Sequence, residues 1–123
     1  MIYTLPMFSS LLSESHKITF SGTNICINLK GYDYDDIYSE VELIFQEVHY
    51  FSKANALFSV DTIEAYDKVL EIFNSSIILQ LMEANRHLFE EINKLQELKH
   101  YSLYLDGYDG YNIVCKSIEI KEL

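Results

Sequence analysis

The feature that most constrains the fold is an apolar stretch that runs from Ser76 to Leu98. Its large apolar side chains recur at three- and four-residue spacing, which places them on one face of an α-helix: Ile77, Ile78, Leu81, Met82, Leu88, Phe89, Ile92 and Leu95. A helix of this length would extend roughly 33 Å, about the width of a small domain. We therefore expect one long helix with these side chains buried: Ile78, Leu81, Leu88, Phe89 and Ile92.

Alternating apolar and polar residues predict strands before this helix. Lys17–Phe20 and Asn24–Leu29 flank a short turn, and together they predict a β-hairpin in which Gly22 supplies the conformational freedom of the turn. Glu40–Tyr50 alternates in the same way and predicts a third, long strand. The apolar residues of Phe51–Phe58 lose this period, so no structure is assigned to them.

A second hairpin is expected after the helix. Its strands are Tyr101–Leu105 and Tyr111–Ile120, and the pairs Asp106-Gly107 and Asp109-Gly110 mark the turn. The expected fold class is α+β, an antiparallel sheet of five or six strands packed on the one long helix at about 76–98. The chain has one proline and four glycines and no shift in composition, which favours a single domain over residues 1–123.

Residues 61–73 fit two structures. Asp61 with Glu64 resembles a capping box, and a second short helix would place these residues on one face: Ile63, Tyr66, Leu70 and Phe73. Alternatively, Val69–Phe73 forms a compact strand. The strand is favoured for the second half, because Asn74-Ser75-Ser76 then offers an N-cap for the long helix.

The charge of the chain limits its partners. Nine basic residues stand against nineteen acidic ones, a formal net charge of -10. Binding to nucleic acid needs clustered Lys and Arg, so no nucleic acid partner is expected. The excess of acidic residues either only increases solubility or also steers the protein toward a basic protein partner.

The sequence also bears on location. No apolar stretch reaches membrane-spanning length, and Met1–Leu12 lacks the basic start of a signal peptide. We therefore expect no membrane association and a cytoplasmic location. Cys26 and Cys115 stand outside any CxxC pair, which in a reducing compartment favours two buried or half-buried thiols.

The ligand patterns of metals and cofactors are not met. In an EF-hand loop counted from Asp33, Tyr38 and Ile44 stand where Gly and Glu are required. The four histidines have neither the i,i+4 spacing nor the Cys/His pattern of zinc sites. Phosphate-loop, dinucleotide-binding and GxSxG motifs are absent. We expect no metal and no cofactor, and no residue is assigned as catalytic.

Two acidic, tyrosine-rich segments remain as candidate sites for a partner, the loop Tyr32–Tyr38 and the tip of the second hairpin. Tyrosine is enriched at binding hot spots, and carboxylates meet Lys and Arg across interfaces. The candidate residues are Tyr32, Asp33, Tyr34, Asp35, Asp36, Tyr38, Asp106, Tyr108 and Asp109. The alternative is a solvated loop whose tyrosines lie back on the sheet.

The second half of the chain resembles a known group of proteins. The pattern consists of Ser75-Ser76 before an apolar helix, then Lys99–Asp106, then Tyr111–Cys115. It is similar to a pattern in small, acidic, uncharacterised bacterial proteins, some of which resemble immunity proteins of polymorphic toxin systems. The resemblance implies a sheet packed on one long helix and suggests, by association, neutralisation of a toxin. It implies no catalytic residues.

These observations leave three functional hypotheses. The first is a cytoplasmic, immunity-like protein that binds a basic toxin through its acidic aromatic residues. The second is a small enzyme that uses His100 with Cys115 or a nearby carboxylate, which requires a concave site around His100. The third is a structural or homo-oligomeric subunit in which Tyr111–Ile120 is an exposed edge strand that pairs with its copy.

Overall fold

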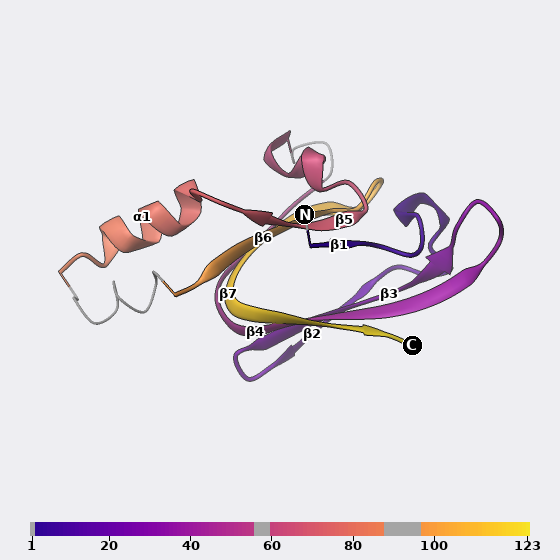
Figure 1. Ribbon diagram of the computed structural model, residues 1–123, viewed down its shortest axis with the longest axis horizontal. Coiled ribbons are helices and arrows are strands. Elements are labelled where there is room, and N and C mark those ends of the chain that lie inside the picture. The colour runs from indigo at the N-terminus through magenta and orange to yellow at the C-terminus, as the bar shows by residue number, and fades with distance from the viewer. Residues whose placement is uncertain (1, 56–59, 88–96) are drawn as a thin grey trace.

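The fold is a curled antiparallel sheet of seven strands with one short α-helix, in a computed structural model that describes residues 2–55, 60–87 and 97–123. The strand order is β1-β5-β6-β7-β4-β3-β2. Figure 1 shows the sheet as an open half-barrel in which β4 and β7 curve between the two sides. The strands are β1 (Tyr3–Thr4), β2 (Lys17–Ser21), β3 (Asn24–Tyr32), β4 (Tyr38–Asn55), β5 (Lys68–Ile72), β6 (Lys99–Tyr104) and β7 (Asp109–Glu122).

Both predicted hairpins are confirmed. β2 pairs with β3 from Lys17–Asn28 to Ser21–Asn24, and Gly22 takes a φ of 60° in the turn. β6 pairs with β7 around the turn at Gly107, whose φ is 76°, whereas Asp109 and Gly110, which were also expected in the turn, belong to β7. Both turns need a left-handed backbone that glycine adopts without steric cost, which is why local residues alone identified them.

The expected fold class is wrong. The described part of the chain is mostly β, and its only α-helix, α1 (Ser76–Ala84), is short and extends away from the end of the sheet (Figure 1). No residue of α1 is buried, and the predicted core residues Ile78 and Leu81 are half-buried. The other predicted core positions, Leu88, Phe89 and Ile92, lie outside the described residues.

The sheet covers its own core instead of packing on a helix. Because the strands curl, the side chains of the inner face meet one another across the half-barrel. The largest fully buried side chains of this core are Tyr111, Phe45, Met7, Ile27, Leu29, Leu43, Leu103, Leu105 and Ile113, of which Met7 and Leu105 come from segments outside the strands. A smaller cluster lies on the outer face, where Leu98 and Val114 pack against the half-buried side chains of α1: Ile77, Ile78, Leu81 and Met82.

The long strand β4 carries the bend. The predicted alternation from Glu40 is confirmed as far as Phe45, but the pairing with β7 shifts register between Val48 and Tyr50, and Glu47 has a φ of 52°. A bulge of this kind bends a strand and increases its twist. Beyond Phe45 the side chains that pack on the core are therefore three residues apart, at Val48 and Phe51, instead of two. This change in spacing explains why the alternation is lost.

Residues 61–73 contain both a short helix and a short strand, one after the other. A 3-10 helix, η3 (Val60–Ala65), replaces the expected α-helix in the first half, and β5 confirms the strand in the second half. Ser75 then caps α1, because its Oγ accepts the N–H of Ile78 at 3.1 Å.

The edge-strand hypothesis for Tyr111–Ile120 is also wrong. β7 lies inside the sheet, paired with β6 on one side and with β4 on the other. Its backbone groups are therefore used within the chain, and the sheet ends instead at β1 and β2.

Candidate functional site

The loop between β3 and β4 presents large apolar and aromatic side chains to solvent. Tyr34 is 77% exposed and Ile37 58% exposed, and Tyr32 and Tyr38 are also exposed. The rings of Tyr32 and Tyr38 meet edge to face, with centroids 5.5 Å apart. The tyrosines therefore stand on the surface at the end of the hairpin and do not lie back on the sheet.

One of the predicted aspartates shapes this loop. Asp33 Oδ1 accepts the backbone N–H groups of Asp35 at 2.8 Å and of Ile37 at 3.0 Å, and Asp36 turns the chain with a φ of 58°. An aspartate that bonds its own backbone in this way rigidifies a turn. The carboxylates of Asp35 and Asp36 remain exposed, so they are the loop acids that face solvent.

The N-terminal segment packs against the loop between β3 and β4. The ring of Phe8 stacks on that of Tyr34, with centroids 4.0 Å apart and an interplanar angle of 25°. The backbone N–H of Phe8 donates to Tyr32 O at 3.1 Å. The next residue, Ser9, is buried, and its Oγ accepts the backbone N–H of Asp106 at 2.8 Å. Phe8 and Ser9 thereby connect the loop to the hairpin tip.

Tyr66, which follows η3, makes a second connection. Its hydroxyl donates to Asp106 Oδ2 at 3.2 Å. Burial raises the pKa of Tyr66 to about 12, with further contributions from Asp106, Asp67 and Tyr34. The sequence placed Tyr66 on the apolar face of a helix, and no local pattern links it to a residue forty positions away.

We call the group formed by the loop, Tyr66 and Asp106 the acidic aromatic surface. The residues of this surface are Tyr32, Tyr34, Asp35, Asp36, Ile37, Tyr38, Tyr66 and Asp106. Of the predicted residues at the tip of the second hairpin, only Asp106 belongs to it.

The other two predicted residues of the hairpin tip lie in a different environment. Tyr108 is half-buried against the core, and its ring meets that of His16 edge to face at 5.2 Å. Asp109 Oδ2 accepts the hydroxyl of Tyr111 at 3.4 Å, and that hydroxyl lies 2.5 Å from His16 Nε2. Burial lowers the pKa of His16, against the opposing effect of Asp109. Both residues therefore hold the hairpin on the core.

The predicted pairing of His100 with Cys115 is wrong, because the two side chains lie on opposite faces of the sheet. His100 is opposite Val114 on the outer face, and Cys115 belongs to the core of the inner face. Burial raises the pKa of the Cys115 thiol to about 12, which disfavours the thiolate that a nucleophile requires. Cys26 is half-buried, so both thiols are placed as expected.

The buried His100 instead bonds two neutral side chains. His100 Nδ1 lies 2.6 Å from Ser75 Oγ, and His100 Nε2 lies 2.8 Å from Asn112 Oδ1. Ser102 Oγ donates to the same amide oxygen at 2.8 Å. The strand register explains the group, since Ser102 is opposite Asn112 and the pleat puts both on the face of His100.

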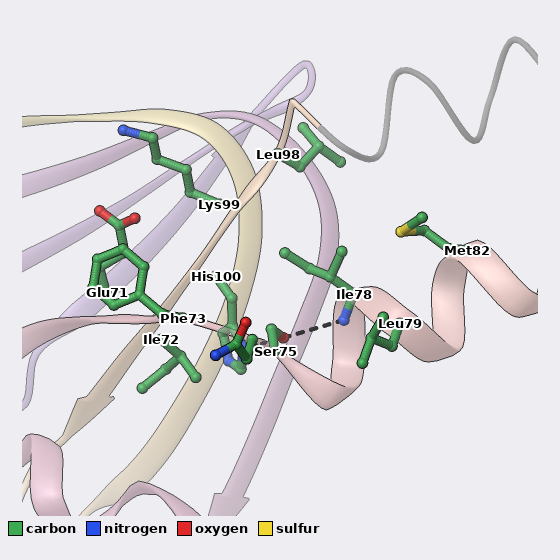
Figure 2. A pocket seen from close by; sticks show the side chains of 11 residues that line it. Glu71, Ile72, Phe73, Ser75, Ile78, Leu79, Met82, Leu98, Lys99 and His100 are labelled. Atoms are coloured by element: carbon green, nitrogen blue, oxygen red, sulfur yellow. Dashed lines mark hydrogen bonds between the residues drawn. The ribbon is translucent and has the colours of Figure 1, made fainter.

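His100 and Ser75 also line a pocket of about 330 Å³ between α1 and the ends of β5 and β6 (Figure 2). Most of its wall is apolar, and its other lining residues are Glu71, Ile72, Phe73, Asn74, Ile78, Leu79, Met82, Leu98 and Lys99. A pocket therefore lies beside His100, and it is lined by Ser75 and not by Cys115. The sequence identified Ser75 only as a helix cap, and nothing local ties it to His100.

The described part of the chain holds no group of three or more His, Cys, Asp or Glu side chains arranged for a metal ion. Within the same ranges, no helix has the length and apolar character needed to cross a membrane. Comparison with protein-family models, with curated proteins and with solved structures gives no match for this chain.

Proposed function

We propose that this protein binds a basic protein partner through the acidic aromatic surface. The observation that carries the proposal is the cluster of exposed large side chains on a braced loop, with Tyr34 and Ile37 more than half exposed. An exposed apolar cluster rimmed by charge is typical of a protein interaction site. Bracing by Phe8 and Asp33 keeps the loop in one conformation, which reduces the entropy lost on binding.

The charge of the surface indicates the chemistry of the partner. Asp35, Asp36 and Asp106 are exposed, and the segment from Tyr32 to Tyr38 contains no Lys or Arg. Tyrosine faces accept Arg and Lys by cation–π contact, and the adjacent carboxylates pair with the same groups. A net charge of -10 adds long-range steering toward a positive protein.

The resemblance to immunity proteins supports a basic toxin as that partner, with neutralisation by occlusion as the function. Two free cysteines fit a reducing compartment, which supports a cytoplasmic location. Under this proposal the protein has no catalytic role toward its partner, and affinity arises from the tyrosines while the carboxylates set the association rate.

The test uses two charge-reversed variants of equal net charge. The site variant carries Asp35→Lys and Asp106→Lys, and the control carries Glu83→Lys and Glu119→Lys on exposed positions elsewhere. Asp33 is left intact because it holds the loop. Proteins retained from a lysate of the source cells by the wild-type protein are purified, and their association rates are measured at low salt.

We expect the site variant to associate at least about tenfold more slowly than the control, with a smaller dependence on ionic strength. Tyr34→Ala should instead act mainly on the dissociation rate. Equal rates for the site and control variants contradict the proposal, as does a wild-type protein that retains no basic protein from the lysate.

A further inference from the structure

The pocket beside α1 carries a second inference that is independent of the acidic aromatic surface. We infer that Ser75, His100 and Asn112 form a nucleophilic site that hydrolyses small carboxylic esters with an apolar acyl group. Ser75 is the nucleophile, His100 the general base, and Asn112 the residue that positions the imidazole.

The hydrogen bonds give His100 the tautomer that a base requires. Asn112 Oδ1 is an amide oxygen, which only accepts, and it lies 2.8 Å from both His100 Nε2 and Ser102 Oγ. His100 Nε2 therefore carries the proton, and Nδ1 presents its lone pair to the Ser75 hydroxyl at 2.6 Å. This distance is within the range of an activated nucleophile and its base.

The surroundings supply the other requirements of acyl transfer. Ser75 and His100 are each only 5% exposed, and both line the pocket, so a ligand would reach them from the pocket side (Figure 2). Ser75 is also the N-cap of α1, whose first N–H groups have no partner within the helix. Such groups, at the positive end of the helix dipole, can stabilise an oxyanion.

The size and lining of the pocket define the substrate class. A volume of about 330 Å³ lies at the lower end of small-molecule sites. Ile72, Leu79 and Met82 line it, which suits a short apolar acyl chain. The ester carbonyl would lie at Ser75, at the N-terminus of α1. The N–H of Ile78 already donates to Ser75 Oγ, which leaves the N–H groups of Ser76 and Ile77 as donors to the oxyanion.

The reaction is a balanced hydrolysis. Ser75 Oγ forms a bond to the acyl carbon while its proton passes to His100 Nδ1, and the ester C–O bond breaks as that proton passes to the departing alcohol. Water then attacks the acyl-serine, giving one proton to His100, which returns it to Ser75 as the carboxylic acid leaves. Asn112 carries no charge to offset the imidazolium that forms, so we expect slow turnover.

The test measures covalent labelling by a fluorophosphonate with a short alkyl chain. Intact mass and peptide mapping should show one adduct, at Ser75, on the folded protein. Ser75→Asn should abolish labelling while keeping the helix cap, because asparagine is as good an N-cap as serine. Ser76→Ala, at the exposed neighbouring position, should label at the wild-type rate.

Two further variants test the roles of the other residues. His100→Gln should slow labelling about 10²–10⁴-fold, the range of a general base. Asn112→Ala should also slow it, and Asn112→Asp should restore or exceed the wild-type rate, because a carboxylate accepts the same hydrogen bonds and stabilises the imidazolium. A structural role alone would not produce that recovery. Hydrolysis of p-nitrophenyl butyrate should follow the same order.

Circular dichroism and urea unfolding verify that each variant is folded. The inference is overturned if the folded wild-type protein gains no adduct at Ser75, in which case Ser75 is a helix cap only. It is equally overturned if His100→Gln is folded and labels as fast as wild type.

Discussion

The buried thiol of Cys115 should make the protein lose stability at alkaline pH in a way that one substitution removes. The side chain is fully buried in the core of the inner face, and its Sγ donates to Ser117 O at 3.4 Å. Burial raises the pKa of this thiol from 9.0 to about 12. The pKa of the thiol is higher in the folded protein than in the unfolded chain. Its contribution to the free energy of unfolding is therefore fully present below pH 9 and is lost as pH rises from 9 to about 12.

The magnitude follows from the two pKa values. At about pH 10.5 the thiol has released its proton in the unfolded chain and has kept it in the folded protein. At about 1.4 kcal/mol per pH unit, this difference lowers the free energy of unfolding by roughly 2 kcal/mol. Tyr101, whose pKa burial raises to about 12, adds a further loss in the same range. That contribution remains in a Cys115→Ala variant, so the difference between the two proteins isolates the thiol.

The assay is urea unfolding of the wild-type protein and Cys115→Ala at about pH 8 and about pH 10.5, under reducing conditions. The variant is less stable at both values because it loses core contacts, but between them it should lose roughly 2 kcal/mol less than wild type. A slow reaction of Cys115 with a thiol reagent should accompany this result. Equal losses for the two proteins would refute the placement of the thiol in a desolvated core.

Two further substitutions test the packing by urea unfolding. Phe45→Ala in the fully buried core should cost about 3–5 kcal/mol, whereas Phe73→Ala at a 73% exposed position should change stability by less than about 0.5 kcal/mol; similar losses would mean that the core is misplaced. Gly31→Ala should cost about 1–3 kcal/mol, because the new Cβ would lie 2.8 Å from Leu11 O and 2.9 Å from Leu12 Cα, both backbone atoms; an unchanged midpoint would contradict this close approach.

The sequence predicted those parts of the fold that depend on neighbouring residues. The turns at Gly22 and Gly107, the alternation that ends at Phe45, and the cap at Ser75 are each encoded within a few residues, and each is confirmed. The strand in the second half of residues 61–73 is also confirmed, because β5 ends just before that cap.

The layer arrangement could not be predicted because it depends on the bend in β4. The register shift between Val48 and Tyr50 lets β4 and β7 curl, and a curled sheet buries its own inner face. The apolar spacing that begins at Ser76 is real, but α1 uses it to pack against Leu98 and Val114 at the end of the sheet. Helical periodicity shows which face is apolar, and it does not show what covers that face.

For the candidate sites, too, the sequence predicted the local features and missed the long-range contacts. The tyrosines of Tyr32–Tyr38 are exposed together with Asp35 and Asp36, as expected for an acidic loop between two strands, because connecting loops run over the surface. The contact with Asp106 runs through Phe8, Ser9 and Tyr66, which the chain brings together only by folding. Long-range contacts of this kind leave no periodic signal in a single sequence.

The two candidate sites lie at opposite ends of one strand, and this separates their functions. His100 stands at the start of β6, next to the pocket, and Asp106 follows the end of β6 at the acidic aromatic surface. Six residues of extended chain keep the two ends roughly 17 Å apart. A partner that covers Tyr34 and Asp106 therefore need not cover Ser75. If binding of that partner slowed the labelling of Ser75, the two ends would have to be coupled through β6, whose side chains from His100 to Tyr104 are all buried.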